Sequence, residues 1–403
     1  MDDSLYFTEQ HLAVRNMVRE FARSEVAPVA AELDARAEFT WANIKKMGEL
    51  GLLGIPWPEE LGGAGLDLLS YMIVINEMAK VDASHAITIS AHTTLGTSPI
   101  VNFGTAAQKK KHVPLLASGK VLGGFGLTEP SAGSDAASTR STAVRKGSHY
   151  VLNGTKAFIT HGGVGEVFVV TAVTEPGKGT KGISSFIVTK QASDLDKSGG
   201  IGHDDSLPAM PGFRAGKKED KLGWRASDTR SLVFEDVEVP AENLLGEEGE
   251  GFNNFMRTLD SGRVGMAALS LGIAEGAFEQ ALRYATLRKQ FGQPIANFQG
   301  IQFQLADMAT EIEAAKHLMF HAAWLAQHKQ PFTKQAAIAK LYCSELAMRT
   351  TIKAIQIHGG YGYTKEYPVE RMFRDAKICE IGEGTSEIQR LVIARNLLKE
   401  LAD

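Results

Sequence analysis

The sequence predicts an α+β multidomain protein in which a middle β domain lies between two helical domains. Apolar residues recur at helical spacing up to about residue 120, β-prone runs of strand length follow to about residue 240, and helical spacing then returns. Helices and strands form separate blocks instead of alternating βα units, and no G-x-G-x-x-G motif follows a predicted strand. We therefore expect domains over residues 1–120, 121–240 and 241–403, without a doubly wound nucleotide-binding sheet.

The composition argues against several classes of protein. A chain of 403 residues with a net charge of −4 lacks the basic excess that is typical of nucleic-acid binders. Its two cysteines, Cys343 and Cys379, are too few for a disulfide framework or a metal site of known spacing. The start, "MDDSLYFTEQ", shows no targeting signal, and no apolar run approaches the ~20 residues of a membrane helix. We expect a cytoplasmic bacterial protein with no metal, no membrane and no nucleic-acid partner.

The helical blocks follow from apolar spacing and end signals. Thr40 can cap a helix that Gly51 can end. The Pro/Gly-rich stretch "WPEELGGAGLD" predicts a loop after it. Helices are expected over 40–51, about 71–80, 264–285 and about 299–326.

The middle block is read as a compact β domain. In "HYVLNGTKAFIT" two β-prone runs flank Asn153-Gly154, which predicts a hairpin turn at that dipeptide. "VFVVTAV", "GISSFIVTK" and "RSLVFEDVEVP" are further strand-length runs. Residues 191–213 are rich in turn formers and predict a long surface excursion.

Two stretches of the middle block are candidate ligand sites. "FGLTEPSAGSD", residues 125–135, offers small side chains, amides and hydroxyls that suit a phosphate-rich or amide-rich ligand, or it is a solvated turn. In "KAFIT", Phe158 and Thr160 are expected on one face of a strand. They either flank a flat ring or form part of the core and its rim.

The C-terminal block holds two more candidates. In "LDSGR", Asp260 and Arg263 are three residues apart at the start of a predicted helix, where they form a local ion pair or hold a polar ligand. Arg288, in "RKQFG", ends that helix, and a cation is favourable there in any case. The glycines of "QIHGG" end the preceding helix.

The stretch "EIGEGTSEIQR" places Glu383 between two glycines, Gly382 and Gly384. Ser386 and Gln389 have capping-box spacing, so Glu383 is expected in the loop before the last helix. A carboxylate at a helix N-terminus is electrostatically favoured. The glycines reflect either a turn or a ligand that occupies the space beside Glu383.

Together these stretches resemble the acyl-CoA dehydrogenase family, in particular its short-chain (butyryl-CoA) branch. The motifs "FGLTEPSAGSD", "VLNGTKAFIT", "GKKEDKLG", "TLDSGR", "RKQFG", "FQLADMA", "QIHGG", "VERMFRDAK" and "EGTSEIQR" match family motifs in the family's order and cover essentially the whole chain. The resemblance implies a barrel-like middle sheet, a C-terminal four-helix bundle, FAD as cofactor and electron-transfer flavoprotein as electron acceptor. It also implies a homotetramer built as a dimer of dimers.

The resemblance assigns site residues position by position. FAD would be lined by Phe125, Leu127, Thr128, Gly133, Ser134, Phe158, Ile159 and Thr160. From a neighbouring subunit it would be reached by Arg288, Phe291, Gln299, Gln356, Gly359 and Gly360, with Thr385 and Glu387 completing that site. The acyl-CoA thioester would contact Ser134, Asp260, Arg263, Gly382 and Gly384.

The catalytic base is expected to be Glu383. Some branches of the family carry the base on the "TLDSGR" helix, but the matching position here is Gly262, which has no side chain to serve. The resemblance implies that Glu383 removes the proton α to the thioester carbonyl while the β-carbon delivers hydride to flavin N5, which yields a trans-2-enoyl-CoA. Burial beside an acyl chain would raise the pKa of Glu383 toward that of a working base.

The chain departs from the family pattern at two positions. Short- and medium-chain members usually have Tyr before the base, whereas this chain has Gly382, a feature shared with isovaleryl-type members. We therefore expect a short acyl group, straight or branched, including isovaleryl, isobutyryl or 2-methylbutyryl. Trp224 replaces the usual small aliphatic residue, which would alter the CoA entrance or a docking surface, or neither. An acyl-CoA oxidase, a flavin monooxygenase and a DNA-binding relative are the competing predictions.

Overall fold

The computed structural model describes residues 7–190 and 210–401, and most of the predicted 191–213 excursion lies outside them. The N-terminal block is helical: α1 (Glu9–Phe21), α2 (Ala27–Arg36), α3 (Trp41–Glu49), α4 (Leu68–Ala79), α5 (Ala83–Ser90), α6 (Ser98–Phe103) and α7 (Ala106–Ala117). The strands follow as β1 (Gly123–Gly126), β2 (Thr142–Lys146), β3 (His149–Thr160), β4 (Val167–Val173), β5 (Ile183–Thr189), β6 (Phe213–Lys218) and β7 (Thr229–Pro240). The C-terminal helices are α8 (Gly251–Leu287), α9 (Gln299–Gln327), α10 (Thr333–His358), α11 (Val369–Lys377) and α12 (Ser386–Glu400), with a small hairpin of β8 (Lys289–Gln290) and β9 (Gln293–Pro294).

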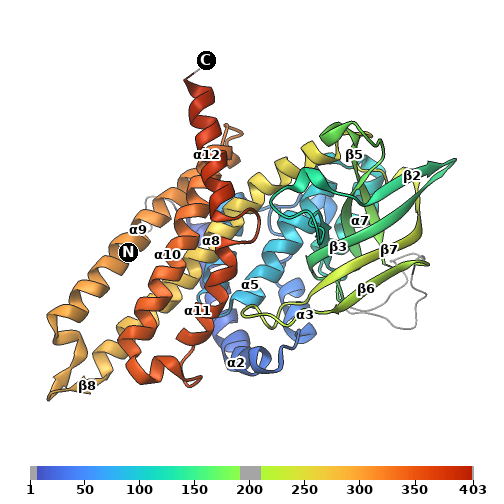
Figure 1. The fold of residues 1–403 in the computed structure, drawn as a ribbon. Coiled ribbons are helices and arrows are strands. Elements are labelled where there is room, and N and C mark those ends of the chain that lie inside the picture. Colours follow the sequence, from blue (N-terminus) through green and yellow to red (C-terminus); the bar gives the residue numbers. More distant parts are fainter. Residues whose placement is uncertain (1–6, 191–209, 402–403) are drawn as a thin grey trace.

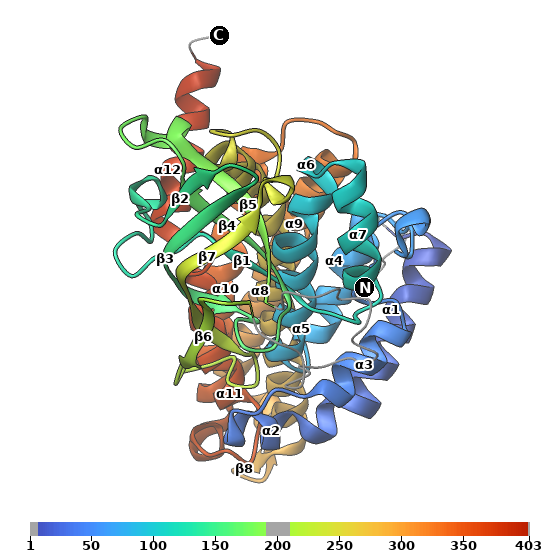
Figure 2. The same ribbon diagram turned by 90° about the vertical axis from the view of Figure 1, so that its right-hand side faces the viewer.

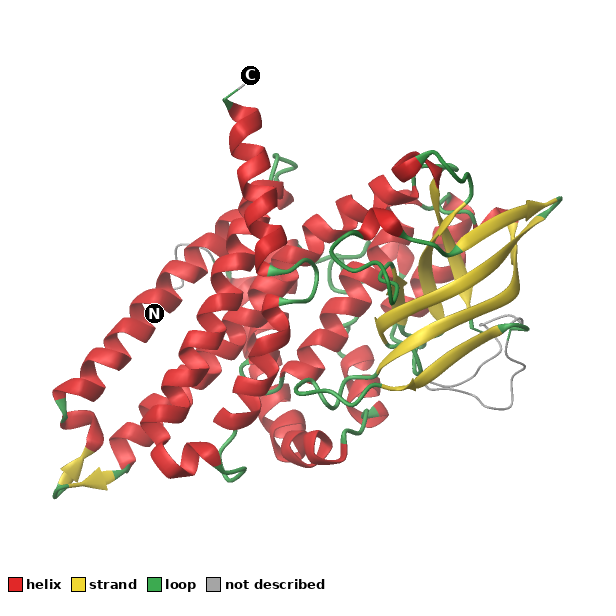
Figure 3. Cartoon of the chain, in the orientation of Figure 1, coloured by secondary structure: helices red, strands yellow, loops and turns green. Residues whose placement is uncertain are grey.

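The arrangement confirms the predicted fold class. Among the described residues the large sheet has the strand order β1-β4-β2-β3-β7-β6, with β5 paired to β4. It curls at one end of the molecule, where β4 and β5 pack on the first part of α8 (Figures 1 and 3). α8, α9 and α10 pack against one another, and α11 and α12 pack on α10. Within the described part of the chain, no helix has the length and apolar character needed to cross a membrane.

The two helical blocks share one hydrophobic core. Buried apolar residues of α1, α3, α4 and α5 belong to the same cluster as those of α8, α9, α10 and α11. α4 packs directly on α8, with Ile75 and Met78 buried on one side and Leu271 on the other. Figure 2 shows the N-terminal helices lying beside the central α8. The sheet has a core of its own.

Local signals place the first helices as expected. The Thr40 side chain accepts a hydrogen bond from the backbone N–H of Asn43 and caps α3. Gly51 has a φ of 71°, the left-handed conformation that glycine tolerates best.

The hairpin prediction at Asn153-Gly154 is wrong. β3 runs unbroken through this dipeptide, and the register with β7 shifts between Leu152 and Gly154, which marks a β-bulge. The turn lies between β2 and β3, where Gly147, with a φ of 63°, is followed by Ser148. Gly147-Ser148 is a less frequent two-residue turn than Asn-Gly, which is why the sequence favoured the wrong dipeptide. Gly154, with a φ of 147°, instead belongs to the bulge.

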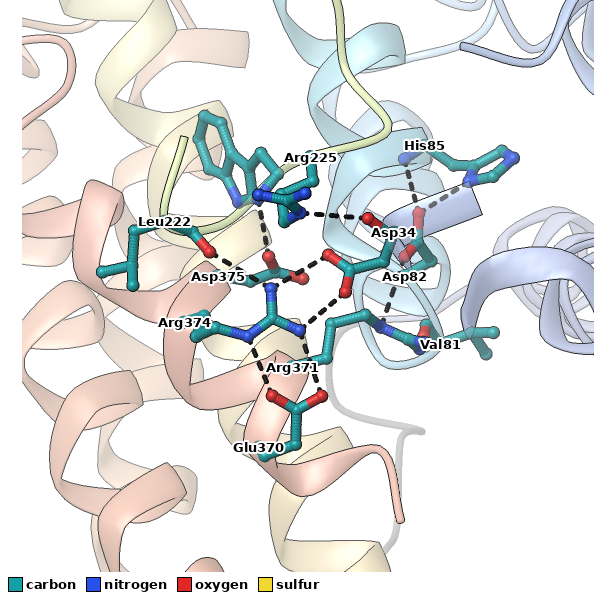
Figure 4. A network of polar contacts seen from close by, with 11 residues as sticks. Asp34, Val81, Asp82, His85, Leu222, Arg225, Glu370, Arg371, Arg374 and Asp375 are labelled. Carbon is teal, nitrogen blue, oxygen red and sulfur yellow. Dashed lines mark hydrogen bonds and ion pairs between the residues drawn. The ribbon is translucent and has the colours of Figure 1, made fainter. Parts of the chain in front are cut away.

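Trp224 joins the middle block to the helices. Its indole is buried in the helical core, and its backbone N–H donates to Asp375 Oδ1 of α11 at 2.7 Å. Nearby, Arg374 of α11 binds the carboxylates of Asp34 from α2 and Glu370, and donates to the Leu222 carbonyl (Figure 4). This network locks all three blocks together, so Trp224 is a residue of the interdomain junction.

Candidate active site

Glu383 lies in the turn between a 3-10 segment (Ile378–Glu380) and α12. The N-cap of α12 is Thr385, whose hydroxyl accepts from the Ile388 N–H at 3.3 Å, so the predicted capping role of Ser386 is wrong. Gln389 binds the turn instead: its Nε2 donates to the carbonyl oxygens of Glu383 at 3.2 Å and Gly384 at 2.9 Å.

The carboxylate of Glu383 is buried and unsatisfied. The residue is partly exposed, but both carboxylate oxygens are buried, and neither has a hydrogen-bond partner among the described residues. Burial raises the pKa of Glu383 to about 7, although the positive charges of Lys340 and Arg263 oppose the rise. A carboxyl group with this pKa can release and accept protons near neutral pH.

The glycine in α8 makes room for this carboxylate. A Cβ placed on Gly262 would lie 2.1 Å from Glu383 Oε2 and 3.5 Å from a methyl group of Leu95. Any side chain at position 262 would therefore displace the Glu383 side chain. A side chain at position 262 and the carboxylate of Glu383 would compete for the same space, which Glu383 occupies here.

Glycine occupies the two positions that flank Glu383 for different structural reasons. Gly384 has a φ of 92°, and a Cβ there would lie 2.7 Å from Gln389 Nε2, so the backbone itself requires glycine. Around Gly382 a Cβ would meet only the Ile378 carbonyl oxygen within 4 Å, at the ordinary distance of 3.5 Å. The fold thus tolerates a side chain at position 382, and its absence leaves open space beside Glu383.

Asp260 and Arg263 lie on α8, which begins at Gly251, so their predicted position at the start of a helix is wrong. They form the predicted ion pair, and Asp260 also accepts from the Thr333 hydroxyl at 2.8 Å. Arg263 is 5% exposed, and its Nε has no partner among the described residues. The pair therefore keeps one buried donor free next to Glu383.

The loop after β1 presents mostly backbone and small groups. The Phe125 ring is stacked on Phe255 of α8 with centroids 3.9 Å apart, and Leu127 also packs into this apolar cluster. Both residues are only partly buried, so each still offers some surface to a ligand. Gly133 and Ser134 are exposed, and Thr128 is partly buried, with its carbonyl accepting from Ala157 N–H at 2.8 Å.

Phe158 has an unusual conformation on β3. Its φ is 58°, in the left-handed region, and its side chain is 68% exposed. Thr160 is partly buried, whereas Ile159 between them is buried in the sheet core, so Phe158 and Thr160 share the less buried face. A strained, exposed aromatic ring marks a place where a ligand can cover it.

A second group of predicted residues lies at the far end of α8. Arg288 follows α8 directly, and its guanidinium lies 5.8 Å from the Tyr361 ring. A cavity of about 500 Å³ adjoins it, lined by Gln280, Arg283, Tyr284, Leu287, Arg288, His358, Tyr361 and Tyr367. Phe291, Gln299, Gln356, Gly359 and Gly360 are all exposed at the described surface.

These residues are remote from Glu383 in the same chain. Arg288, the C-cap of α8, is 25 positions beyond Arg263 of the same helix, which corresponds to about 38 Å at ~1.5 Å per residue. Thr385 and Glu387, in contrast, begin α12 next to Glu383. One chain therefore does not bring the two groups into one compact site.

Sequence reasoning missed two buried lysines. Lys340 of α10 is fully buried, and its Nζ donates to the Gly384 carbonyl at 2.8 Å. Lys156 of β3 is also fully buried and pairs with Glu129 at 2.7 Å. For Lys340 a signal existed, because its neighbours Ala336 and Cys343 mark the core-facing side of the helix.

Comparisons with known proteins identify the class as the acyl-CoA dehydrogenases. Sequence models of the N-terminal, middle and C-terminal acyl-CoA dehydrogenase domains match residues 8–120, 124–237 and 249–398. The chain therefore belongs to the acyl-CoA dehydrogenase family.

Individual relatives are similar over nearly the whole chain. The short-chain specific acyl-CoA dehydrogenase of Clostridium acetobutylicum is 50% identical over 392 residues, which is 97% of this chain and 99% of the relative. The butyryl-CoA dehydrogenase structure from Megasphaera elsdenii superposes with a TM-score of 0.91, at 45% identity, over 97% of this chain and 99% of the other. A chain from a structural study of the electron transferring flavoprotein of Acidaminococcus fermentans gives a TM-score of 0.92 at 48% identity, over 97% of this chain and 98% of that one.

Proposed function

We propose that this protein is an FAD-dependent short-chain acyl-CoA dehydrogenase that forms trans-2-enoyl-CoA, with Glu383 as the catalytic base. The observation that carries the proposal is the buried carboxylate of Glu383, which has no partner among the described residues and a pKa of about 7. It lies in a chain that resembles short-chain specific and butyryl-CoA dehydrogenases. Anaerobic addition of butyryl-CoA to the purified holoprotein should bleach its flavin absorbance, and a flavin left oxidised would contradict the proposal.

The site residues have distinct roles in this reaction. Glu383 takes the proton α to the thioester carbonyl, because its two oxygens hold no competing donor. The unsubstituted Gly382 lets the thioester oxygen approach the Glu383 backbone N–H, which would stabilise the negative charge that develops there. Arg263 and Asp260 would contact the thioester side of the substrate. FAD, when bound, accepts the hydride from the β-carbon.

The residues present fit FAD. The exposed ring of Phe158 and the neighbouring Thr160 offer a surface for a flat ring system, and the loop from Thr128 to Ser134 offers backbone amides and hydroxyls. An added Cβ on Gly133 would meet no atom within 4 Å. A family member from Bacillus anthracis has been solved as a complex with FAD.

We propose that each FAD site is completed by a neighbouring subunit, within a homotetramer built as a dimer of dimers. The separation between Arg288 and Glu383 supports this arrangement, since both groups are expected at FAD. Phe291 is 92% exposed, which is unfavourable for a lone chain in water and suits a subunit contact. Electron-transfer flavoprotein is the proposed electron acceptor, and peroxide formation in its absence would instead favour an oxidase. A cytoplasmic location stays a prediction.

Subunit sharing can be tested by mixing two defective variants at an FAD concentration too low to saturate the weaker site. R288M should weaken FAD binding by roughly tenfold or more, because it removes a charged donor. If Arg288 serves the neighbour, a mixed dimer of R288M and E383Q holds one site with both residues intact, and dehydrogenation returns after co-refolding. If each chain uses its own Arg288, both sites stay defective. R349M, at a paired surface arginine of α10, is the matched control.

The open space at Gly382 favours branched substrates as a second candidate function. G382Y should fold normally, because a Cβ there meets only the Ile378 carbonyl at 3.5 Å. A phenol ring beside the reacting carbons should reduce kcat/KM for isovaleryl-CoA and isobutyryl-CoA by about tenfold or more relative to butyryl-CoA. The test is the ratio of kcat/KM values in both proteins. An unchanged ratio, or a wild type inactive on every branched substrate, would contradict this role of Gly382.

A further inference from the structure

Lys340 is an unusual residue for the interior of α10. Its side chain is 0% exposed, and the flanking residues Ala336, Ala339 and Cys343 are buried as well. Lysine is almost never fully buried without a partner. The partner here is a backbone atom of the catalytic turn, because Nζ donates to the Gly384 carbonyl oxygen at 2.8 Å.

Gln389 binds the same turn, but it follows the turn in the chain, on α12, whereas Lys340 precedes it. Gln389 is also 0% exposed, and its amide nitrogen donates to the carbonyl oxygens of both Glu383 and Gly384. Together, Lys340 and Gln389 therefore bind the backbone carbonyl groups of Glu383 and of Gly384, which follows it. Neither side chain binds the carboxylate oxygens themselves, which stay without a partner.

The turn needs this support because its backbone is strained. Glu383 has a φ of 55°, and the left-handed region costs about 1 kcal/mol or more for a residue with a Cβ. Such a conformation persists only where surrounding contacts fix it. The direction of the Glu383 side chain follows from this backbone, so the contacts that fix the turn also aim the carboxylate.

Lys340 also brings charge close to the carboxylate. Burial lowers the pKa of Lys340 to about 8, with nearby Cys379 and Glu383 opposing the decrease, so the ammonium persists at neutral pH. The other charged groups that act on this pair are Arg263 of α8 and Glu380, which precedes the turn. Asp260 is engaged by Arg263, and Glu380 by Lys377.

We infer that Lys340 and Gln389 are positioning residues for the base: together they fix the strained Glu383–Gly384 turn, and the buried ammonium of Lys340 favours the ionised carboxylate. The inference rests on the proposed role of Glu383. It assigns to Lys340 an effect on acid–base chemistry that it exerts through another residue, without touching the substrate.

The test compares two substitutions that separate position from charge. K340Q removes the charge and offers the Gly384 carbonyl a neutral amide donor on a side chain one bond shorter, whereas K340M removes both charge and donor. K353M, at a partly exposed lysine of the same helix, is the control. Two quantities are measured in each holoprotein: the infrared titration of the Glu383 carboxyl after labelling with 13C-glutamate, assigned by difference from E383Q, and the pH dependence of flavin reduction by butyryl-CoA.

In K340Q the titration midpoint should move to higher pH, and flavin reduction at pH 6 should fall by roughly tenfold for each pH unit of that shift but recover at high pH. K340M should show the same shift and stay slow at all pH values, because the turn is no longer held. A wild-type midpoint in K340Q would overturn the inference, even if K340M fails to fold. If Glu383 is not the base, butyryl-CoA will still reduce the flavin of E383Q. The titration midpoint of Glu383 will nevertheless be shifted in K340Q, so failure of the proposed function can be told apart from failure of this inference.

Discussion

Replacing Glu383 by Gln should reduce the rate of flavin reduction by butyryl-CoA about a thousandfold or more. The amide has nearly the same shape as the carboxylate but cannot accept the α-proton. No other described carboxylate can substitute for it at this place, because position 262 is glycine and Asp260 is paired with Arg263. The measurement is rapid-mixing absorbance of the oxidised flavin under anaerobic conditions. A variant that bleaches as fast as the wild type would show that Glu383 is not the base.

In the wild type, the rate of flavin reduction should depend on pH through the ionisation of Glu383. Burial raises the pKa of Glu383 to about 7, and only the ionised form can act as a base. The reduction rate should therefore rise as pH increases through about 7 and then level off. E383Q should lose this dependence.

Stability measurements distinguish a catalytic loss from unfolding. The wild type must keep a buried carboxylate ionised above pH 7, which costs up to about 3 kcal/mol for a pKa raised from 4.5 to about 7. Relative to E383Q, its free energy of unfolding should therefore fall between pH 4.5 and 7 and stay lower above that range. E311Q, at a carboxylate of α9 that is paired with Arg349, is the control and should keep its activity.

The fold was predictable because its signals are local and numerous. Apolar spacing located α3, α4, α8 and α9, and the block order separated strands from helices. The Asn153-Gly154 prediction failed because a bulge and a hairpin turn both favour glycine, and only pairing with β7 distinguishes them. The shared helical core was also not predictable, since it depends on α4 packing against α8, far apart in sequence.

The site was predictable only where chemistry coincides with a motif. Glu383 and its flanking glycines stand out in sequence, but the separate reasons for Gly382 and Gly384 appear only from φ and the surrounding atoms. Lys340 looks like an ordinary helix residue until α10 is placed against the catalytic turn. Buried ion pairs cannot be recognised in the sequence either, because the burial of a residue depends on the whole fold.

Replacing Lys156 by Met should reduce the free energy of unfolding by about 3–5 kcal/mol, because it leaves the Glu129 carboxylate buried without its cation. Lys156 Nζ donates to Glu129 at 2.7 Å, to the Thr139 hydroxyl at 3.1 Å and to the Leu127 carbonyl at 3.3 Å. Burial lowers the pKa of Lys156 to about 8, whereas the pKa of Glu129 falls to about 2 despite burial, because Lys156 and several hydrogen bonds favour its charged form. Both groups are thus charged at neutral pH.

The loss should be accompanied by weaker FAD binding, because Glu129 organises the loop that follows β1. Its carboxylate also accepts from the backbone N–H groups of Arg140 at 2.7 Å and Ser141 at 3.0 Å, so it ties the start of the loop to its end. Urea unfolding of apoprotein and FAD titration measure the two effects separately.

A double variant tests whether the cause is the unpaired charge. E129Q/K156M removes the buried charge as well as the cation, so it should recover part of the stability that K156M loses. K146M, at an exposed lysine of β2, should leave both stability and FAD binding unchanged. If the double variant is no more stable than K156M, the loss comes from the missing packing of the lysine side chain. If K156M unfolds like the wild type but binds FAD poorly, the ion pair orders the loop without stabilising the fold.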